Sequence, residues 1–393
     1  MCGIAGFCNF KEDFEENTDY WNFRLEKMRA VLAHRGNDAR GRYLKKHIGL
    51  SHSRLAIRDI LCGDQPMTRT HNGYEYTICY NGEIYNTDEL IPELSENGFV
   101  CSTTSDTEVI LYAYIHWGAD FVNRLNGIFA FAIWDEAKSR LLLYRDRVGV
   151  KPLFYAIRGD SLVFGSEPKA CFAHPAVKPE LDKQGLQELL AIGPAHTSGL
   201  SLFKDLFEVL PGHFMIYSRD GLHDETYWEL TSREHTESYR DTVAHTRFLV
   251  EDAIKRQMVS DVPVCTFLSG GIDSSIVTAI AANYMNTRGK TLNTFSFDFK
   301  DNDRYFKANA FQPERDLPYV NRMLEEYETA HSYLECDENS LFKALFAAVD
   351  AKDMPGMTDV DSSLLYFCSL VSRKNKVALT GECADEIFGG YPW

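Results

Sequence analysis

The second residue of the chain has the chemistry of a nucleophile. The sequence begins Met-Cys-Gly-Ile-Ala-Gly-Phe, and removal of Met1 would leave Cys2 with a thiol and a free α-amine on one carbon. A thiolate is a strong nucleophile, and an α-amine titrates near ~7.7–8.0, so it can act as the general base without a histidine. Taken alone, these residues suit equally well the start of a buried strand that carries Ile4 and Phe7.

A glycine- and serine-rich loop at residues 269–275 could bind phosphate. Its sequence is Ser-Gly-Gly-Ile-Asp-Ser-Ser, and it follows an apolar run at 262–268 that predicts a strand. Two glycines let the backbone approach a polyanion closely, and successive amides at a helix N-terminus bind anions. Asp273 would repel a phosphate, so we expect it to hold Mg²⁺ that bridges phosphate oxygens. A serine-rich helix cap is the simpler alternative, but it requires neither the second glycine nor the carboxylate.

A second acidic cluster follows the strand predicted at 376–379. Its carboxylates include Glu382 and Asp385. Because open parallel sheets bind ligands at the carboxyl ends of their strands, Asp273 and Asp385 are predicted to face one crevice as magnesium ligands. Glu382 could then move protons or stabilise a developing charge. These acidic residues could instead merely favour the N-terminus of a short helix.

The elements around these residues predict two domains. Short apolar and alternating runs between residues 127 and 166 indicate antiparallel strands, so residues 1–230 are predicted to be α+β. Another strand is predicted at 74–80, and the Asn81-Gly82 pair that follows it is a strong turn signal. The polar residues 231–238 form the predicted linker. Strands and helices alternate over 239–393, which predicts an α/β domain with a doubly wound parallel sheet.

Composition narrows the classes of function. The 393 residues carry a formal net charge of −16, which argues against nucleic acid or an anionic membrane as the main partner. No signal segment follows Met1, and no apolar run is long enough to predict a membrane span. The ten cysteines form no C-x-x-C pair, which favours reduced thiols in a cytoplasmic protein over a disulfide framework.

Two motifs point to a known family. Residues 269–275 resemble the PP-loop of the ATP pyrophosphatases, which cleave ATP between its α and β phosphates. With residues 381–391, Gly-Glu-Cys-Ala-Asp-Glu-Ile-Phe-Gly-Gly-Tyr, the chain resembles the glutamine-hydrolysing asparagine synthetases, and its first half resembles the class II glutamine amidotransferases. The resemblance covers nearly the whole chain. It implies an αββα N-terminal nucleophile hydrolase sandwich followed by an α/β PP-loop domain, with ATP as a substrate and Mg²⁺ as cofactor.

In the first domain the resemblance implies a glutaminase. Cys2 matches the nucleophile that attacks the side-chain amide of glutamine, and Asn81 and Gly82 match the oxyanion hole. Arg54 matches the arginine that binds the α-carboxylate of the substrate. The other matching positions in the glutamine pocket are Leu55, Ile57, Glu83 and Asp106, the last two beside the α-amino group. Without the resemblance, Arg54 would suggest a surface ion pair and Asp106 a helix N-cap.

In the second domain the resemblance implies an ATP site and a complete reaction. The matching ATP-binding positions are Phe267 and Phe297 around the adenine, and Ser269, Gly271, Asp273, Ser274, Thr380 and Gly381 on the phosphate side. Aspartate would be adenylated on its β-carboxylate, and ammonia would arrive through an internal tunnel to give asparagine, AMP and pyrophosphate. The expected partners are therefore glutamine, aspartate and ATP. The resemblance also allows a homodimer, because members of the family commonly form one.

The chain also departs from the family pattern. Cys383 stands where glycine is usual, and Thr380 stands where serine is usual. Family chains normally continue well beyond Trp393, so we expect a truncated form that could hydrolyse glutamine without completing the synthesis. Two alternatives stay open, namely an amidotransferase for another carboxylate and a non-synthetic regulatory protein that keeps ATP affinity.

Overall fold

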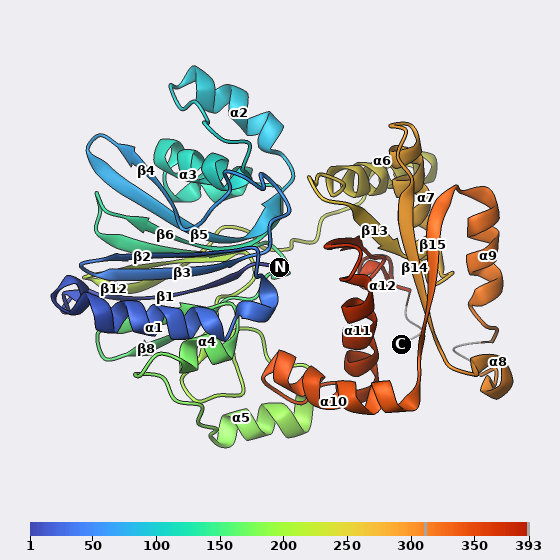
Figure 1. Cartoon of the computed structure of the whole chain (residues 1–393). Coiled ribbons are helices and arrows are strands. Elements are labelled where there is room, and N and C mark those ends of the chain that lie inside the picture. The colour runs from blue at the N-terminus through green and yellow to red at the C-terminus, as the bar shows by residue number, and fades with distance from the viewer. Residues whose placement is uncertain (310–312, 391–393) are drawn as a thin grey trace. The chain divides into compact units, whose positions relative to one another are not determined.

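The structure is a computed structural model that describes residues 1–309 and 313–390. The chain divides into two compact units (Figure 1). The first comprises Met1–Ser232 and the short segment Lys352–Gly356, and the second comprises Arg233–Ala351 and Met357–Trp393. Tyr391, the last residue of the second motif, lies outside the described residues. Within the described ranges, no helix is both long and apolar enough to pass through a lipid bilayer.

The first unit contains two antiparallel sheets of six strands each. In order across the first sheet, the strands are β10 (Phe207–Glu208), β8 (Phe154–Arg158), β9 (Ser161–Gly165), β1 (Gly3–Asn9), β3 (Ile48–Arg54) and β2 (Ala39–Lys45). In order across the second sheet, they are β12 (Gly221–Thr226), β11 (His213–Ser218), β7 (Arg140–Arg145), β6 (Gly127–Asp135), β5 (Tyr74–Ile84) and β4 (Met67–His71).

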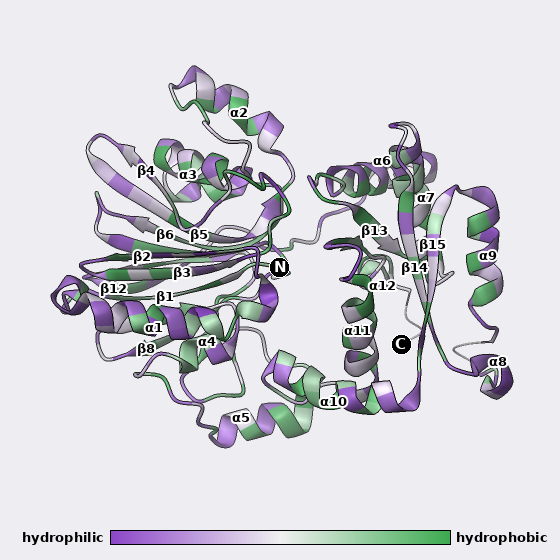
Figure 2. Ribbon diagram, viewed as in Figure 1, coloured by the Kyte–Doolittle hydropathy of each residue, from purple (hydrophilic) through white to green (hydrophobic). Residues whose placement is uncertain are grey.

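The two sheets pack face to face and carry helices on their outer sides, which gives four layers (Figure 1). Alternation along β1 explains this arrangement, because successive side chains of a strand point to opposite faces. Ile4 and Cys8 belong to the core between the sheets, whereas Ala5 and Phe7 belong to the core under the helices. Figure 2 shows hydrophobic residues running along these strands. The predicted αββα sandwich is confirmed.

Helices cover the outer faces of the sandwich. They are α1 (Thr18–Ala30) and α4 (Pro168–Phe172) on the first sheet and α3 (Asp106–Trp117) on the second, with α2 (Thr87–Glu96) packed against α3. Helix α5 (Lys183–Gln187) comes later in the chain. Asn17 caps the start of α1 by accepting a hydrogen bond from the Tyr20 N–H. The N-cap of α3 is Ser105 and not Asp106, which is the first helical residue. The interpretation of Asp106 as an N-cap was therefore wrong.

Strand β5 corrects a second prediction. It does not end at residue 80 but runs through Asn81 and Gly82 as far as Ile84. The Asn-Gly pair favours a turn only where the chain can reverse, and here β6 pairs with β5 from Tyr76 opposite Asp135 to Ile84 opposite Gly127. Tertiary pairing therefore overrides the local turn signal.

The second unit is built on a parallel sheet of four strands. In order across the sheet, they are β15 (Thr329–Cys336), β14 (Leu292–Phe299), β13 (Val264–Phe267) and β16 (Val377–Leu379). The helices of this unit are α6 (Tyr239–Arg256), α7 (Ile272–Asn286), α8 (Asn302–Tyr305), α9 (Leu317–Glu326), α10 (Glu338–Lys352), α11 (Thr358–Val371) and α12 (Ala384–Phe388). Every strand pair is parallel, which confirms the predicted α/β class.

Candidate active sites

Cys2 precedes β1, and its thiol lies against the backbone of Leu55. The Leu55 N–H points to Sγ at 3.4 Å, and Sγ lies 3.6 Å from Leu55 O. Burial raises the pKa of the Cys2 thiol, while the Leu55 amide, the N-terminal amine and Arg54 act in the opposite direction. Burial also lowers the pKa of the Met1 amine from 8.0 to about 5, so this amine is neutral near pH 7.

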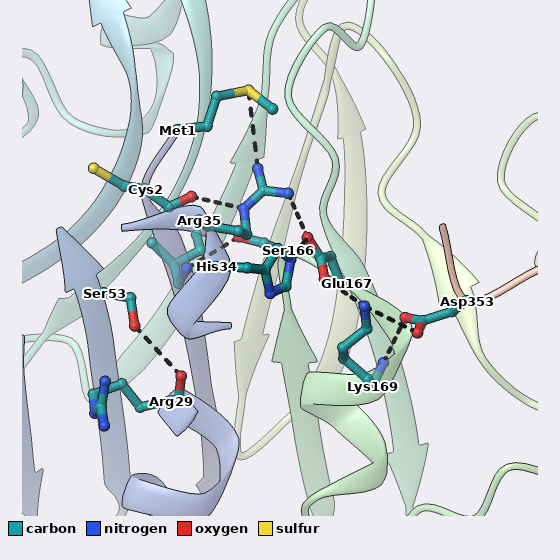
Figure 3. Close-up of polar contacts among 11 residues, drawn as sticks. Met1, Cys2, Arg29, His34, Arg35, Ser53, Ser166, Glu167, Lys169 and Asp353 are labelled. Atoms are coloured by element: carbon teal, nitrogen blue, oxygen red, sulfur yellow. Dashed lines mark hydrogen bonds and ion pairs between the residues drawn. The ribbon is translucent and has the colours of Figure 1, made fainter. Parts of the chain in front are cut away.

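The Cys2 carbonyl is fixed by a chain of charged side chains (Figure 3). Arg35 Nε donates to Cys2 O at 2.9 Å, and Arg35 Nη1 donates to Glu167 Oε1 at 2.7 Å. Lys169 Nζ lies 3.1 Å from Glu167 Oε2 and 3.1 Å from the carboxylate of Asp353. None of these four charged residues could be identified from the sequence, because they meet only through tertiary packing.

Glu167→Gln is expected to destabilise the protein in a pH-dependent way. Burial alone would raise the pKa of Glu167, but hydrogen bonds from His34 and Arg35 lower it from 4.5 to about 2. A carboxylate with a lower pKa in the folded state stabilises the fold above its unfolded pKa, and this contribution disappears as the pH falls from 4.5 towards 2. We expect the variant to lose about 2–3 kcal/mol of unfolding free energy at pH 7, measured by urea denaturation.

The control for this experiment is Glu93→Gln, because the pair between Glu93 and Arg124 is largely exposed. Its loss should change the unfolding free energy by less than about 1 kcal/mol. An effect of Glu167→Gln that stays the same from pH 7 to pH 2 would contradict the ionic role of the carboxylate.

Arg54 is buried at the end of β3, so its interpretation as a surface ion pair was wrong. Nη1 donates to Ile60 O at 3.1 Å and to the Asp64 carboxylate at 3.0 Å, while Nη2 donates to Asp59 O at 2.5 Å. The Arg54 side chain is 6% exposed, whereas that of Asp64 is 76% exposed. The guanidinium therefore already binds one carboxylate, and the exposure of Asp64 leaves that partner exchangeable. Leu55 and Ile57 follow directly at half-buried positions.

Asn81 and Gly82 lie next to each other within β5. Asn81 is 1% exposed, and no described residue accepts a hydrogen bond from its Nδ2. A buried donor without a partner costs free energy, so it marks a position where an acceptor from outside the protein would bind. Gly82 lies so close to β6 that a Cβ there would be 2.3 Å from Ile128 O. Only glycine fits at this position.

Two carboxylates, Glu83 and Asp106, interact electrostatically with the Cys2 thiol. Burial raises the pKa of Glu83 to about 9, and the charges of Asp106 and Cys2 act in the same direction. Burial also raises the pKa of Asp106, while Arg58 opposes this effect. Asp106 Oδ2 accepts a hydrogen bond from Tyr80 OH at 2.8 Å. Two buried carboxylates whose negative charges would repel each other favour a bound cation such as an ammonium group.

In the second unit, the serines of the loop at 269–275 hold it in shape. Ser269 Oγ and Ser274 Oγ are 2.9 Å apart, and the Gly271 N–H points to Ser269 Oγ at 3.4 Å. Gly270 has a φ of +88°, a conformation that favours glycine. Gly271 is the N-cap of α7, so the loop connects the carboxyl end of β13 to a helix N-terminus. The first amides of α7 lack helical partners and are the groups that bind anions in such loops.

The loop after β16 reaches the start of α7. Because β13 and β16 are parallel neighbours, with Thr266 opposite Leu379, both loops leave from the same edge of the sheet. A Cβ on Gly381 would lie 2.7 Å from the Asp273 carbonyl carbon and 2.7 Å from Ser274 N. The structure therefore brings the two motifs together, and the backbone of the second touches the first turn of α7.

The acidic residues of the two motifs provide carboxylates but no preformed cage. Asp385 Oδ1 lies against Gly390, so a Cβ added to that glycine would be 1.8 Å away. Glu382, which follows Thr380 and Gly381 in the sequence, is exposed. Among the described residues, no group of three or more His, Cys, Asp and Glu side chains could hold a metal. Mg²⁺ at phosphate sites usually takes only one or two protein carboxylates, so a pair of aspartates fits its chemistry.

Three aromatic rings meet near the carboxyl ends of β13 and β14. The ring centroid of Phe367, on α11, lies 4.6 Å from that of Phe267 and 5.1 Å from that of Phe297. Both strand residues are half-buried. Phe367 could not be identified from the sequence, because its place on a helix gives no sign that its ring would meet two strand ends.

Comparison with known proteins agrees with this geometry. The glutamine amidotransferase domain family matches residues 1–228, and the asparagine synthase family matches residues 245–393. Two Bacillus subtilis proteins named asparagine synthetase [glutamine-hydrolyzing] 3 and 1 are 49% and 32% identical over the whole chain, which spans 64% and 59% of their lengths. A similarly named protein from Methanocaldococcus jannaschii is 32% identical to the chain, and the chain covers 76% of its length. The chain belongs to the glutamine-hydrolysing asparagine synthetase family.

Membership of the asparagine synthetase family confirms the resemblance seen in the sequence. The chain spans less than two thirds of the length of the two Bacillus relatives. Among solved structures, a glutamine phosphoribosylpyrophosphate amidotransferase from B. subtilis aligns with 100% of the chain at 16% identity and a TM-score of 0.43. That superposition is too loose to add to the fold seen here.

One departure from the asparagine synthetase pattern has a backbone consequence. Cys383, where the family usually has glycine, is the N-cap of α12 and has a φ of 69°. Residues with a Cβ pay an energetic penalty in this left-handed region, which glycine avoids. The usual glycine therefore suits the backbone that this loop adopts.

Proposed function

We propose that the first unit hydrolyses the side-chain amide of glutamine with Cys2, freed by removal of Met1, as the nucleophile. The observation that carries this proposal is the buried amide of Asn81, which no described residue satisfies, in the unit that also buries the Cys2 thiol. The neighbouring Gly82 N–H supplies a second donor. Glutamate release from glutamine by the purified chain tests the proposal, and absence of release would overturn it.

The reaction needs no histidine. The Cys2 amine takes the thiol proton while sulfur forms a bond to the amide carbon, and Asn81 Nδ2 and the Gly82 N–H stabilise the resulting oxyanion. Collapse of this intermediate breaks the carbon–nitrogen bond, and the amine passes its proton to the leaving nitrogen to give ammonia. Water then attacks the thioester, the amine again accepts a proton, and glutamate leaves with the thiol restored.

Substrate recognition follows from the charges of the pocket. The α-carboxylate of glutamine would take the place of Asp64 on Arg54, where a bidentate contact suits the guanidinium. Leu55 and Ile57 would line this side of the pocket with their backbone. The α-ammonium would lie between Glu83 and Asp106, where it would offset the burial and the repulsion from Asp106 that raise the pKa of Glu83.

For the second unit, we propose that ATP binds at the carboxyl edge of the parallel sheet. The phosphates would be bound by the first amides of α7 and by Ser269 and Ser274. The adenine would lie against Phe267 and Phe297. The remaining positions on the phosphate side are Gly271, Thr380 and Gly381. Asp273 and Asp385 would hold Mg²⁺, which neutralises phosphate charge when bound. Glu382 would move a proton during the reaction or stabilise a developing charge.

Together these sites support synthesis of asparagine. ATP would adenylate the β-carboxylate of aspartate and release pyrophosphate, and ammonia from glutamine would displace AMP. This proposal rests on family membership, since the named relatives are asparagine synthetases and the chain spans 64% of the first of them. Pyrophosphate release with a panel of carboxylates tests it. Release that depends on aspartate supports the proposal, whereas release with another carboxylate alone contradicts it.

Gly381→Val is expected to abolish ATP binding. The added side chain would meet the Asp273 and Ser274 backbone, because even a Cβ lies 2.7 Å from both. The first turn of α7 must then move away from the phosphate position, which we expect to weaken binding by at least about 100-fold in calorimetric titration. Arg373→Ala, at an exposed site before β16, is the control. Unchanged affinity in Gly381→Val would contradict the placement of the phosphates.

A further inference from the structure

One edge of β5 loses its strand partner just before the proposed oxyanion hole. β4 pairs with β5 no further than Met67 opposite Ile78. On the other edge, the Tyr85 N–H donates to Asn126 O at 2.7 Å, next to the end of β6. Because backbone groups alternate between the two edges of a strand, residues 80, 82 and 84 direct their N–H and C=O groups to the edge without a partner.

Side chains take the place of the missing strand at Tyr80. The Tyr80 N–H donates to Gln65 Oε1 at 2.6 Å, and His52 Nε2 lies 3.0 Å from Tyr80 O. A carbonyl can only accept, so Nε2 carries the hydrogen and donates it. His52 comes from β3 in the other sheet, so this hydrogen bond crosses the interior of the sandwich.

Ile84 is held in the same way two residues beyond Gly82. The Ile84 N–H donates to Asp106 Oδ2 at 3.1 Å, and Arg58 Nη1 donates to Ile84 O at 2.9 Å. The side chains on this edge thus satisfy the backbone on both sides of Gly82. The Gly82 N–H lies between two occupied positions and faces the same edge, where a ligand oxygen can reach it.

We propose that His52 and Gln65 are positioning residues for the oxyanion donors Asn81 and Gly82. This inference rests on the proposed glutaminase function. Tyr80 transmits their effect directly, because it precedes Asn81 in the chain and its ring packs on Gly82, where a Cβ would lie 2.6 Å from Tyr80 Cε2. Displacement of Tyr80 therefore displaces both donors, and oxyanion stabilisation requires their correct placement.

Both positioning residues are themselves held firmly. His52 is fully buried, and burial lowers its pKa to about 4, so it stays neutral at physiological pH. No described residue pairs with its Nδ1, so the hydrogen bond to Tyr80 is the polar contact that orients the ring. Gln65 is 9% exposed, and its Nε2 donates to Thr107 Oγ1 at 3.2 Å. Gly41 packs on its backbone, since a Cβ there would lie 1.8 Å from Gln65 O.

The test compares His52→Leu, which removes the donor, with His52→Gln, whose side-chain amide can replace Nε2. Steady-state glutamine hydrolysis gives kcat and KM, and the rate of Cys2 alkylation by iodoacetamide reports the thiol without needing the oxyanion hole. We expect His52→Leu to lower kcat by about 10- to 100-fold, with KM and alkylation nearly unchanged. His52→Gln should recover most of kcat.

Three results would overturn the positioning role: wild-type kcat in His52→Leu, equal loss in both variants, or alkylation that falls in step with kcat. If His52→Leu does not fold, Gln65→Leu and Gln65→Glu give the same comparison, because glutamate keeps the acceptor for the Tyr80 N–H. Asn81→Ala separates this inference from its basis. If wild type releases glutamate and Asn81→Ala matches it, the oxyanion assignment fails, and with it the positioning role.

Discussion

Cys2→Ala is expected to abolish glutamine hydrolysis. The thiol is the atom that forms the covalent intermediate, and loss of a nucleophile typically lowers kcat by at least about 10⁴-fold. Glutamate release by purified protein measures the effect. Synthesis from ammonia should survive the substitution, because ammonia bypasses the glutaminase.

The matched control for this prediction is Cys62→Ser, since the Cys62 thiol is exposed. It should hydrolyse glutamine at the wild-type rate. Glutamate release by Cys2→Ala at more than a small fraction of that rate would show that another group is the nucleophile.

Asn81→Ala is expected to lower kcat for glutamine hydrolysis by about 10²–10³-fold, which corresponds to the loss of one oxyanion donor. KM should change little, because the oxyanion forms only in the transition state. The substitution should not destabilise the fold by leaving an unpaired group, since no described residue accepts from Asn81 Nδ2. Kinetics and thermal unfolding together measure this combination.

Asn86→Ala is the control, because it should affect the stability of the fold and not kcat. Asn86 Nδ2 donates to Arg124 O at 2.9 Å, and its Oδ1 accepts from the Asn126 N–H at 2.9 Å. Its removal should lower the melting temperature and leave kcat of the folded protein unchanged. If Asn81→Ala instead behaved like Asn86→Ala, the Asn81 amide would be structural.

Much of the second unit could be predicted from the sequence because its signals are local. An apolar run followed by glycines and serines predicts a strand, a phosphate-type loop and a helix, and the structure has β13 and α7 there. The edge strand β15 was missed, because its half-exposed and polar sequence, TAHSYLEC, lacks a clear apolar face. Helix α2 was missed as well, since it contains Pro92.

The candidate site of the first unit depended more on tertiary contacts. Asn81-Gly82 suggested a turn, and only the pairing of β5 with β6 shows that both residues belong to a strand. Arg54 suggested a surface pair, whereas its guanidinium is enclosed by the backbone of residues 58–60. His52 and Gln65 carry no local signal, because their partner Tyr80 is 28 and 15 residues away. The family resemblance supplied the roles that local patterns did not predict.

The proposed glutaminase reaction depends on Cys2 acting as an N-terminal nucleophile with its own amine as base. The most direct test is a protein with a protease-cleavable extension ahead of Cys2, assayed for glutamate release before and after cleavage, with intact mass confirming each form. We predict no release while the extension blocks the amine, and full activity once cleavage makes Cys2 the first residue. Hydrolysis by the uncleaved protein at the rate of the cleaved one would contradict the claim.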